Sequence, residues 1–116
     1  MKYLHVTGRE DWRAWLRENH DIETEVWLVI NKKHAWTPGI NYNDAVEEAL
    51  CYGWIDGLAR SHNEESYVQR FTPRRPKSNW SDSNKHRVRK LIAMGLMTEA
   101  GLAKVPLDIL NSDRTM

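Results

Sequence analysis

Apolar residues near the start of the chain recur with a helical spacing. Trp12 and Leu16 stand four residues apart, with a further apolar residue between them, which predicts an amphipathic helix over residues 8–19. Thr7 and Glu10 occupy the two positions of a capping box, in which each side chain satisfies a free amide at the helix start. We therefore expect this helix to bury one aromatic stripe in the core.

Three other segments have the composition of strands. Residues 25–32 are almost continuously apolar in their middle, which is typical of a strand at the centre of a sheet, and residues 2–6 predict a shorter strand. Residues 54–60 and 66–72 flank a polar turn at 62–65, so they predict a β-hairpin.

Three more helices are expected, each after a residue that can cap it: residues 44–52 after Asn43, 82–94 after Ser81 and 98–105 after Thr98. Gly53 and Gly95 follow two of them, where a left-handed residue commonly ends a helix. The order is therefore β-α-β-α-β-β-α-α. It predicts one small α+β domain over residues 1–105, a mixed or antiparallel sheet with helices packed on it, and a fraying tail at 106–116.

The hairpin gives a testable register. Strands paired symmetrically about the turn set Asp56 opposite Arg70, within salt-bridge distance. The same pairing sets Leu58 opposite Val68 and Trp54 opposite Thr72. Asp56 then has three interpretations: it fixes the hairpin register, it orients Arg70 as one wall of an anion pocket, or it acts as an acid or base.

Composition narrows the class of protein. The longest apolar run, 26–30, is far shorter than a membrane span, and the N-terminal residues lack the apolar core of a signal peptide, so we expect a cytoplasmic protein. Cys51 is the single cysteine, which excludes an internal disulfide and favours an inert core thiol. The five histidines form no ligand motif. We therefore predict no metal, no cofactor and no catalytic residue.

Charge is distributed unevenly along a chain whose net charge is +1. Residues 69–90 carry eight Lys/Arg against one Asp, a net charge of +7, whereas residues 1–68 carry seven against twelve acids, a net charge of −5. Such a basic block is the usual electrostatic footprint of an anionic partner. Alternatively, the charges of the helix over 82–94 form a solvated face.

Several sequence runs carry a family resemblance. Residues 49–57 read ALCYGWIDG, residues 67–76 read YVQRFTPRRP, and NWS follows at 79–81. The chain resembles the YdeI/OmpD-associated family, often labelled bacteriocin-protection proteins, over residues 1–105. Longer members carry a second, helical C-terminal part, so this sequence is similar to a short form. The resemblance implies an association with resistance and no known reaction.

Candidate ligand-binding residues gather at the end of the hairpin and in the loop after it. A guanidinium suits a phosphate or carboxylate, and prolines stiffen the basic loop that precedes Trp80 and a helix start. The predicted anion site comprises Trp54, Asp56, Arg60, Tyr67, Arg70, Arg74, Arg75, Lys77 and Trp80.

The sequence thus predicts a non-enzymatic binding domain for a phosphate-bearing ligand, nucleic acid or nucleotide, through residues 70–90. Single-stranded nucleic acid or a nucleotide is favoured over duplex DNA, because a loop with a stacking ring offers no recognition helix. Two alternatives stay open. One is a small-molecule-binding protein or enzyme with a pocket around Trp54, Asp56, Tyr67 and Arg70, and the other is a protein-interaction module in stress or bacteriocin resistance.

Overall fold

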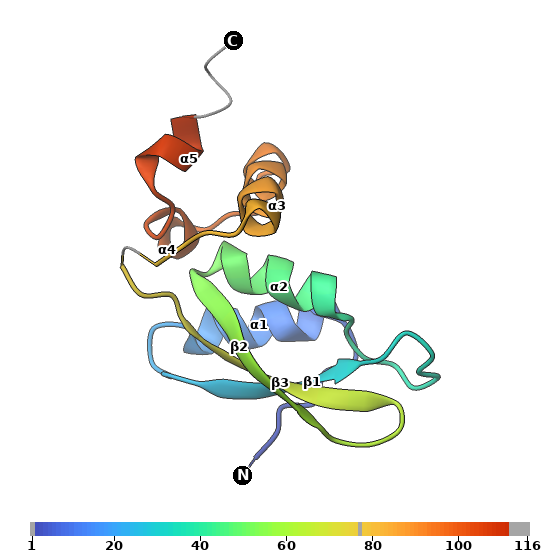
Figure 1. Ribbon diagram of the computed structural model, residues 1–116. Coiled ribbons are helices and arrows are strands. Elements are labelled where there is room, and N and C mark those ends of the chain that lie inside the picture. Colours follow the sequence, from blue (N-terminus) through green and yellow to red (C-terminus); the bar gives the residue numbers. More distant parts are fainter. Residues whose placement is uncertain (1, 77, 112–116) are drawn as a thin grey trace.

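The computed structural model describes residues 2–76 and 78–111, and it confirms a single small α+β domain (Figure 1). Its elements in chain order are α1 (Arg9–Asn19), β1 (Val26–Asn31), α2 (Tyr42–Cys51), β2 (Trp54–Ser61), β3 (Ser66–Pro73), α3 (Asp82–Ala93), α4 (Glu99–Leu102) and α5 (Leu107–Asn111). Within the described residues, no helix has the length and apolar content needed to cross a membrane.

Side-chain caps explain where the later helices begin. Ser81 accepts the amide of Asn84 at the start of α3, and Thr98 accepts the amide of Gly101 at the start of α4, as predicted. The cap of α2 was predicted two residues too late. Asn41, not Asn43, accepts the Asp44 amide at 2.8 Å, so that helix begins at Tyr42.

At the helix ends, one prediction is wrong and one is confirmed. The capping box of α1 does not form, because Gly8 holds the N-cap position and Thr7 bonds Asp11 instead of Glu10. Gly53 and Gly95 have φ values of 76° and 72°. Both therefore terminate their helices in the left-handed region that glycine tolerates best, as expected.

The three strands form one antiparallel sheet in the order β1-β3-β2. The prediction that residues 25–32 form the central strand is wrong, because β3 lies between the other two. Residues 2–6 form no regular strand either. Leu4 makes a single parallel bridge to Leu28, donating to the Trp27 carbonyl at 2.8 Å and accepting from the Val29 amide at 3.0 Å. The apolar run of β1 is buried because Leu28 and Ile30 pack into the core on one face of the sheet, while Arg60 covers Trp27 on the other.

A β-bulge overturns the predicted hairpin register. Asp56 pairs with Phe71, whereas Ala59 pairs with Gln69, so two residues of β2 lie opposite Arg70. The Gln69 side chain donates to the carbonyls of both bulged residues. A shift of one residue moves a side chain to the other face of the sheet. Asp56 and Arg70 therefore lie on opposite faces, and the predicted salt bridge between them is wrong.

Helix α2 is the centre of the fold. It packs against α1, β1 and β2 on one side and against α3 and α4 on the other, so the sheet, two helices and a C-terminal helical group form successive layers (Figure 1). The side chains packed around it form one apolar cluster. Its largest fully buried members include Trp12, Trp54, Phe71 and Leu16. The aromatic stripe of α1 is core, as the sequence predicted.

A network of ion pairs joins α1, α2 and α3 beside this core. Glu47 and Glu48 of α2 are each only 3% exposed. Arg9 pairs with both of them, and Arg13 pairs with Glu48 at 2.8 Å. Lys90 of α3 pairs with Glu47. Because removing one partner leaves the others desolvated and unpaired, this network helps to fix how the three helices dock.

The predicted tail contributes more than expected up to residue 111. Residues 107–111 form α5, and Ile109 packs into a second small apolar cluster with Val88 and Val105. The rest of the predicted tail, 112–116, lies outside the described residues.

Candidate functional site

A hollow of about 890 Å³ lies between the loop after β1 and the first turn of α2. We call it the tyrosine groove. It is lined by Asn31, Lys32, Lys33, Gly39, Asn41, Tyr42, Asn43, Asp44 and Tyr67. The groove combines two phenol rings, two lysines and three asparagines, which suits a polar ligand with an aromatic or planar part.

Asp56 connects the hairpin to this groove. The bulge places its side chain on the face of the sheet that carries Tyr67 and α2. The Tyr42 hydroxyl donates to Asp56 Oδ2 at 2.7 Å. A hydrogen bond to a carboxylate is short and strong, so it fixes the Tyr42 ring against the end of β2.

Burial and the Asp56 charge both act on the two phenols. Partial burial, followed by the hydrogen bond to Asp56 and its charge, raises the pKa of Tyr42 to about 12. The pKa of Tyr67 is raised too, first by burial and then by Asp56. Both phenols are therefore neutral near pH 7, and Tyr42 gives its single hydroxyl proton to Asp56.

The groove has a positive balance despite the acids near it. Lys33 is exposed, and Lys32 donates from Nζ to the Asn63 carbonyl at 3.1 Å. Asp44, the acidic side chain that lines the groove, is paired with Arg9 at 3.1 Å. The lysines are consequently the lining charges left available to a ligand.

A second hollow continues from the tyrosine groove towards α3. It is lined by Glu47, Asp82, Ser83, His86, Arg87 and Lys90, together with Asn43, which lines both hollows. Arg87 donates to Asn43 Oδ1 at 3.1 Å and to Asn84 Oδ1 at 3.0 Å. The guanidinium thereby stands at the junction between the two hollows.

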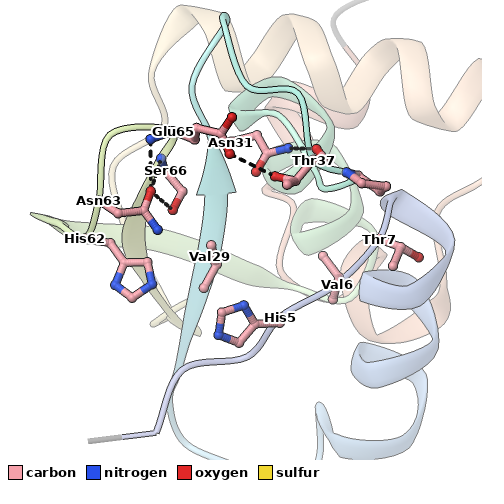
Figure 2. A pocket seen from close by; sticks show the side chains of 11 residues that line it. His5, Val6, Thr7, Val29, Asn31, Thr37, His62, Asn63, Glu65 and Ser66 are labelled. Carbon is pink, nitrogen blue, oxygen red and sulfur yellow. Dashed lines mark hydrogen bonds between the residues drawn. The ribbon is translucent and has the colours of Figure 1, made fainter.

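A third hollow, of about 350 Å³, lies on the other side of the loop after β1 (Figure 2). His5 and His62 face one another across its floor, with ring centroids 6.2 Å apart. Asn63 and Glu65 line its rim through side chains that bond the neighbouring backbone. Most of its polar atoms thus hold the hairpin turn and the loop together.

Three of the predicted site residues lie away from the tyrosine groove. Trp54 is 1% exposed and packs edge-on against Trp15 in the core. Arg60 stacks over the Trp27 ring at 5.1 Å on the outer face of the sheet. Arg70 pairs with Glu25 on that same face. The predicted pocket around Asp56 and Arg70 is therefore wrong, because the bulge separates the two side chains.

The predicted basic loop is also arranged differently. Arg74 is 1% exposed, and its guanidinium lies 3.9 Å from the centre of the Trp80 ring. Its Nη1 donates to the Ser78 hydroxyl at 3.0 Å and to the Asn79 carbonyl at 3.2 Å. Burial lowers the pKa of Arg74. The Arg74 side chain thus lies inside the loop that follows it and bonds the loop at Ser78 and Asn79, rather than facing solvent.

The remaining members of the predicted site divide between surface and interior. Arg75 is exposed, whereas Trp80 is half-buried and packs against both apolar clusters. Lys77 lies outside the described residues. The structure therefore brings together Asp56 and Tyr67 at the groove, and Arg74 with Trp80 beneath the loop, and the Asp56 charge also acts on buried Arg74 and opposes the lowering of its pKa.

Sequence reasoning missed Tyr42 and the two lysines. The signal was present, because Lys32 and Lys33 end an apolar strand and Tyr42 follows a polar helix cap. Residues at the ends of strands and in connecting loops carry function more often than core residues. The dense charge of residues 69–90 drew the prediction away from them.

Among the described residues, no group of three or more His, Cys, Asp or Glu side chains is placed to hold a metal ion. A comparison with curated proteins and with solved structures found no match. A protein-family model does match residues 4–104, which is most of the chain. The chain therefore belongs to the family described as Domain of unknown function (DUF8412).

Proposed function

We propose that this domain is a non-enzymatic binding protein for a phosphate-bearing ligand, nucleic acid or nucleotide, and that the tyrosine groove receives it. The observation that carries the proposal is the pairing of Lys32 and Lys33 with two neutral tyrosines in a groove of about 890 Å³. Ammonium groups attract phosphate oxygens, and the phenol rings add a stacking surface.

The tyrosine groove supports this function better than the loop around Arg74 and Arg75. Arg74 is buried, and Arg70 and Lys90 are committed to Glu25 and Glu47. In contrast, Lys33 is exposed and lines an open hollow. A cation that must leave an ion pair in order to bind a phosphate gains less from binding.

The use of Asp56 supports the proposal of binding rather than catalysis. One of its carboxylate oxygens is occupied by Tyr42, and the raised pKa of that phenol keeps it protonated at neutral pH, where it is a poor proton donor and supplies no phenolate base. The resemblance to the YdeI/OmpD-associated family gives the proposed setting, which is resistance to stress or to bacteriocins. The alternative function, a protein-interaction module, would also act in resistance to stress or to bacteriocins.

The test is a titration of the protein with three probes: inorganic tripolyphosphate, ATP, and an oligothymidylate of about eight nucleotides. We expect saturable binding tighter than about 100 μM at low salt and a steep loss of affinity as salt is added. Lys33→Ala should flatten the salt dependence by about one phosphate equivalent. The matched control is Arg75→Ala, which removes another exposed cation outside the groove.

Three results would overturn the proposal. If none of the three probes bound saturably, the proposal that the ligand bears phosphate would be wrong. A flattened salt dependence in Arg75→Ala but not in Lys33→Ala would return the site to residues 70–90. Consumption of a probe during incubation, followed by chromatography, would show an enzyme instead of a binding protein.

A further inference from the structure

Trp36 is the most exposed of the large hydrophobic residues that the structure leaves in solvent, at 93%. It lies in the loop between β1 and α2, which also forms one side of the tyrosine groove. An indole ring is among the largest apolar groups a protein can bury, so the fold itself gains nothing from this position. The ring is available to a ligand.

The backbone beneath this ring is held firmly. The Trp36 amide donates to Glu65 Oε1 at 3.2 Å, and the Thr37 hydroxyl donates to Glu65 Oε2 at 3.3 Å. Asn31 then donates from Nδ2 to the Thr37 carbonyl at 2.8 Å (Figure 2). An exposed ring on a fixed backbone loses little conformational entropy when a ligand binds it.

Two lysines precede Trp36 in its loop, and the Glu65 carboxylate beneath the ring is already occupied by the Trp36 amide and the Thr37 hydroxyl. The sequence runs Lys32, Lys33, His34, Ala35, Trp36, and Lys33 lines the tyrosine groove. The His34 ring is tied through Nε2 to the Glu64 carbonyl at 2.9 Å. A bare aromatic ring beside lysines is complementary to a polyanion that carries planar apolar faces, which describes a nucleic-acid strand with unpaired bases.

We propose that Trp36 is a base-stacking platform, so that the ligand of this domain is single-stranded nucleic acid. An unpaired base stacks on the Trp36 indole while Lys33 holds an adjacent phosphate in the tyrosine groove. This inference rests on the proposed function and adds a residue and a substrate class to it. Paired bases in a duplex present only their edges, so a duplex offers no face to the ring.

The experiment measures the affinity of labelled oligothymidylate and of an abasic strand of the same length for three variants. Trp36→Ala should weaken binding of oligothymidylate by about 5- to 150-fold for each stacked base, and Trp36→Phe should retain most of it. Both variants should bind the abasic strand as the wild type does. Ile22→Ala, which removes an exposed apolar side chain before β1, is the matched control and should change neither affinity.

The outcomes separate this inference from the proposed function. Equal binding of oligothymidylate by Trp36→Ala and the wild type, with Lys33→Ala still weakened, would overturn the stacking platform and leave the phosphate site standing. Equal affinity of the wild type for oligothymidylate and for the same strand paired in a duplex would also overturn the stacking platform. Failure of the wild type to bind any strand would overturn both. Self-association in sedimentation that Trp36→Ala abolishes would assign the ring to a contact between two copies. Trp36→Ala should keep the wild-type melting temperature, because the ring makes little contact with the fold.

Discussion

Residues 69–90 and the loop that leads into the tyrosine groove show how differently charge can be used in one small domain. The first region has a net charge of +7, yet Arg70 and Lys90 are paired with acids and Arg74 is buried. The second has only Lys32 and Lys33 beside an open groove. The density of cations in a sequence therefore does not report how many are free to bind a ligand.

The difference arises from where the acids are. Residues 1–68 carry a net charge of −5, and two of their acids, Glu25 and Glu47, reach across the fold to cations of the basic segment. The charge asymmetry along the chain is thus partly an internal match between two halves of one domain. Lys33, by contrast, is exposed and lines the open tyrosine groove.

Of the ion pairs that link the two regions, those of Glu47 should contribute most to stability. Glu47→Ala leaves Lys90 without its carboxylate and removes one of the two buried carboxylates that pair with Arg9, and we expect the free energy of unfolding to fall by about 2–3 kcal/mol. The loss stays below that of a fully buried pair, because both cations are partly exposed and can be rehydrated. Urea denaturation followed by circular dichroism measures it.

The control for this prediction is Lys90→Ala. Glu47 would keep Arg9 as a partner, so the cost should be less than about 1 kcal/mol. If Lys90→Ala instead left stability unchanged and weakened oligonucleotide binding, this lysine would belong to the ligand site and the comparison between the two regions would fail.

The same acid predicts how stability depends on pH. Burial would raise the pKa of Glu47, but hydrogen bonds from Lys90 and Arg9 outweigh it and hold the pKa below its ordinary 4.5. A depressed pKa in the folded state gives stability that is present above about pH 4.5 and is lost as the pH falls through the lower folded value. Glu47→Gln should therefore show a shallower loss of unfolding free energy between about pH 5 and pH 3 than the wild type. Parallel curves for the two proteins would count against the ion pair.

Much of this fold could be predicted from the sequence, because local signals agree with the structure. The helices over α2, α3 and the start of α4 follow from apolar spacing, caps and the left-handed glycines Gly53 and Gly95. The order of strands could not be predicted, since an apolar strand such as β1 is buried equally well at the centre or beside a bridging segment.

The candidate site was less predictable, for a physical reason. The symmetric register required that no residue be inserted, and the bulge after Asp56 changes which face each later side chain occupies. Gly57 in the bulge is a weak hint, because glycine is tolerated in many strands. The pairing of Arg70 with Glu25 joins residues far apart in the chain, so no local pattern could have indicated it.

A smaller effect should separate the hydroxyl of Tyr42 from its ring. Tyr42→Phe removes the hydrogen bond to Asp56, and because the carboxylate is only half-buried and can bind water, stability should fall by about 1 kcal/mol. The ring still lines the groove, so affinity for oligothymidylate should change less than about twofold. Thermal unfolding and the titration above measure the two quantities. A large loss of affinity with unchanged stability would show that the hydroxyl contacts the ligand directly.

The smallest net effect, and the sharpest contrast between the two regions, should come from Arg74. Among the described residues, its Nε and Nη2 have no hydrogen-bond partner although they are buried, so the guanidinium carries a desolvation cost. Arg74→Met keeps the length of the side chain and a favourable contact with Trp80, and it removes that cost together with the cation–π contact. These terms oppose one another, so we expect stability to stay within about 1 kcal/mol of the wild type. Arg74→Ala, which leaves a cavity under Trp80, should cost about 2–3 kcal/mol. The affinity of the protein for oligothymidylate should be the same in Arg74→Met and in the wild type, because the Arg74 side chain faces the interior. A loss of affinity in that folded variant would show that Arg74 turns outward to hold a phosphate, and the basic loop would then replace the tyrosine groove as the binding site.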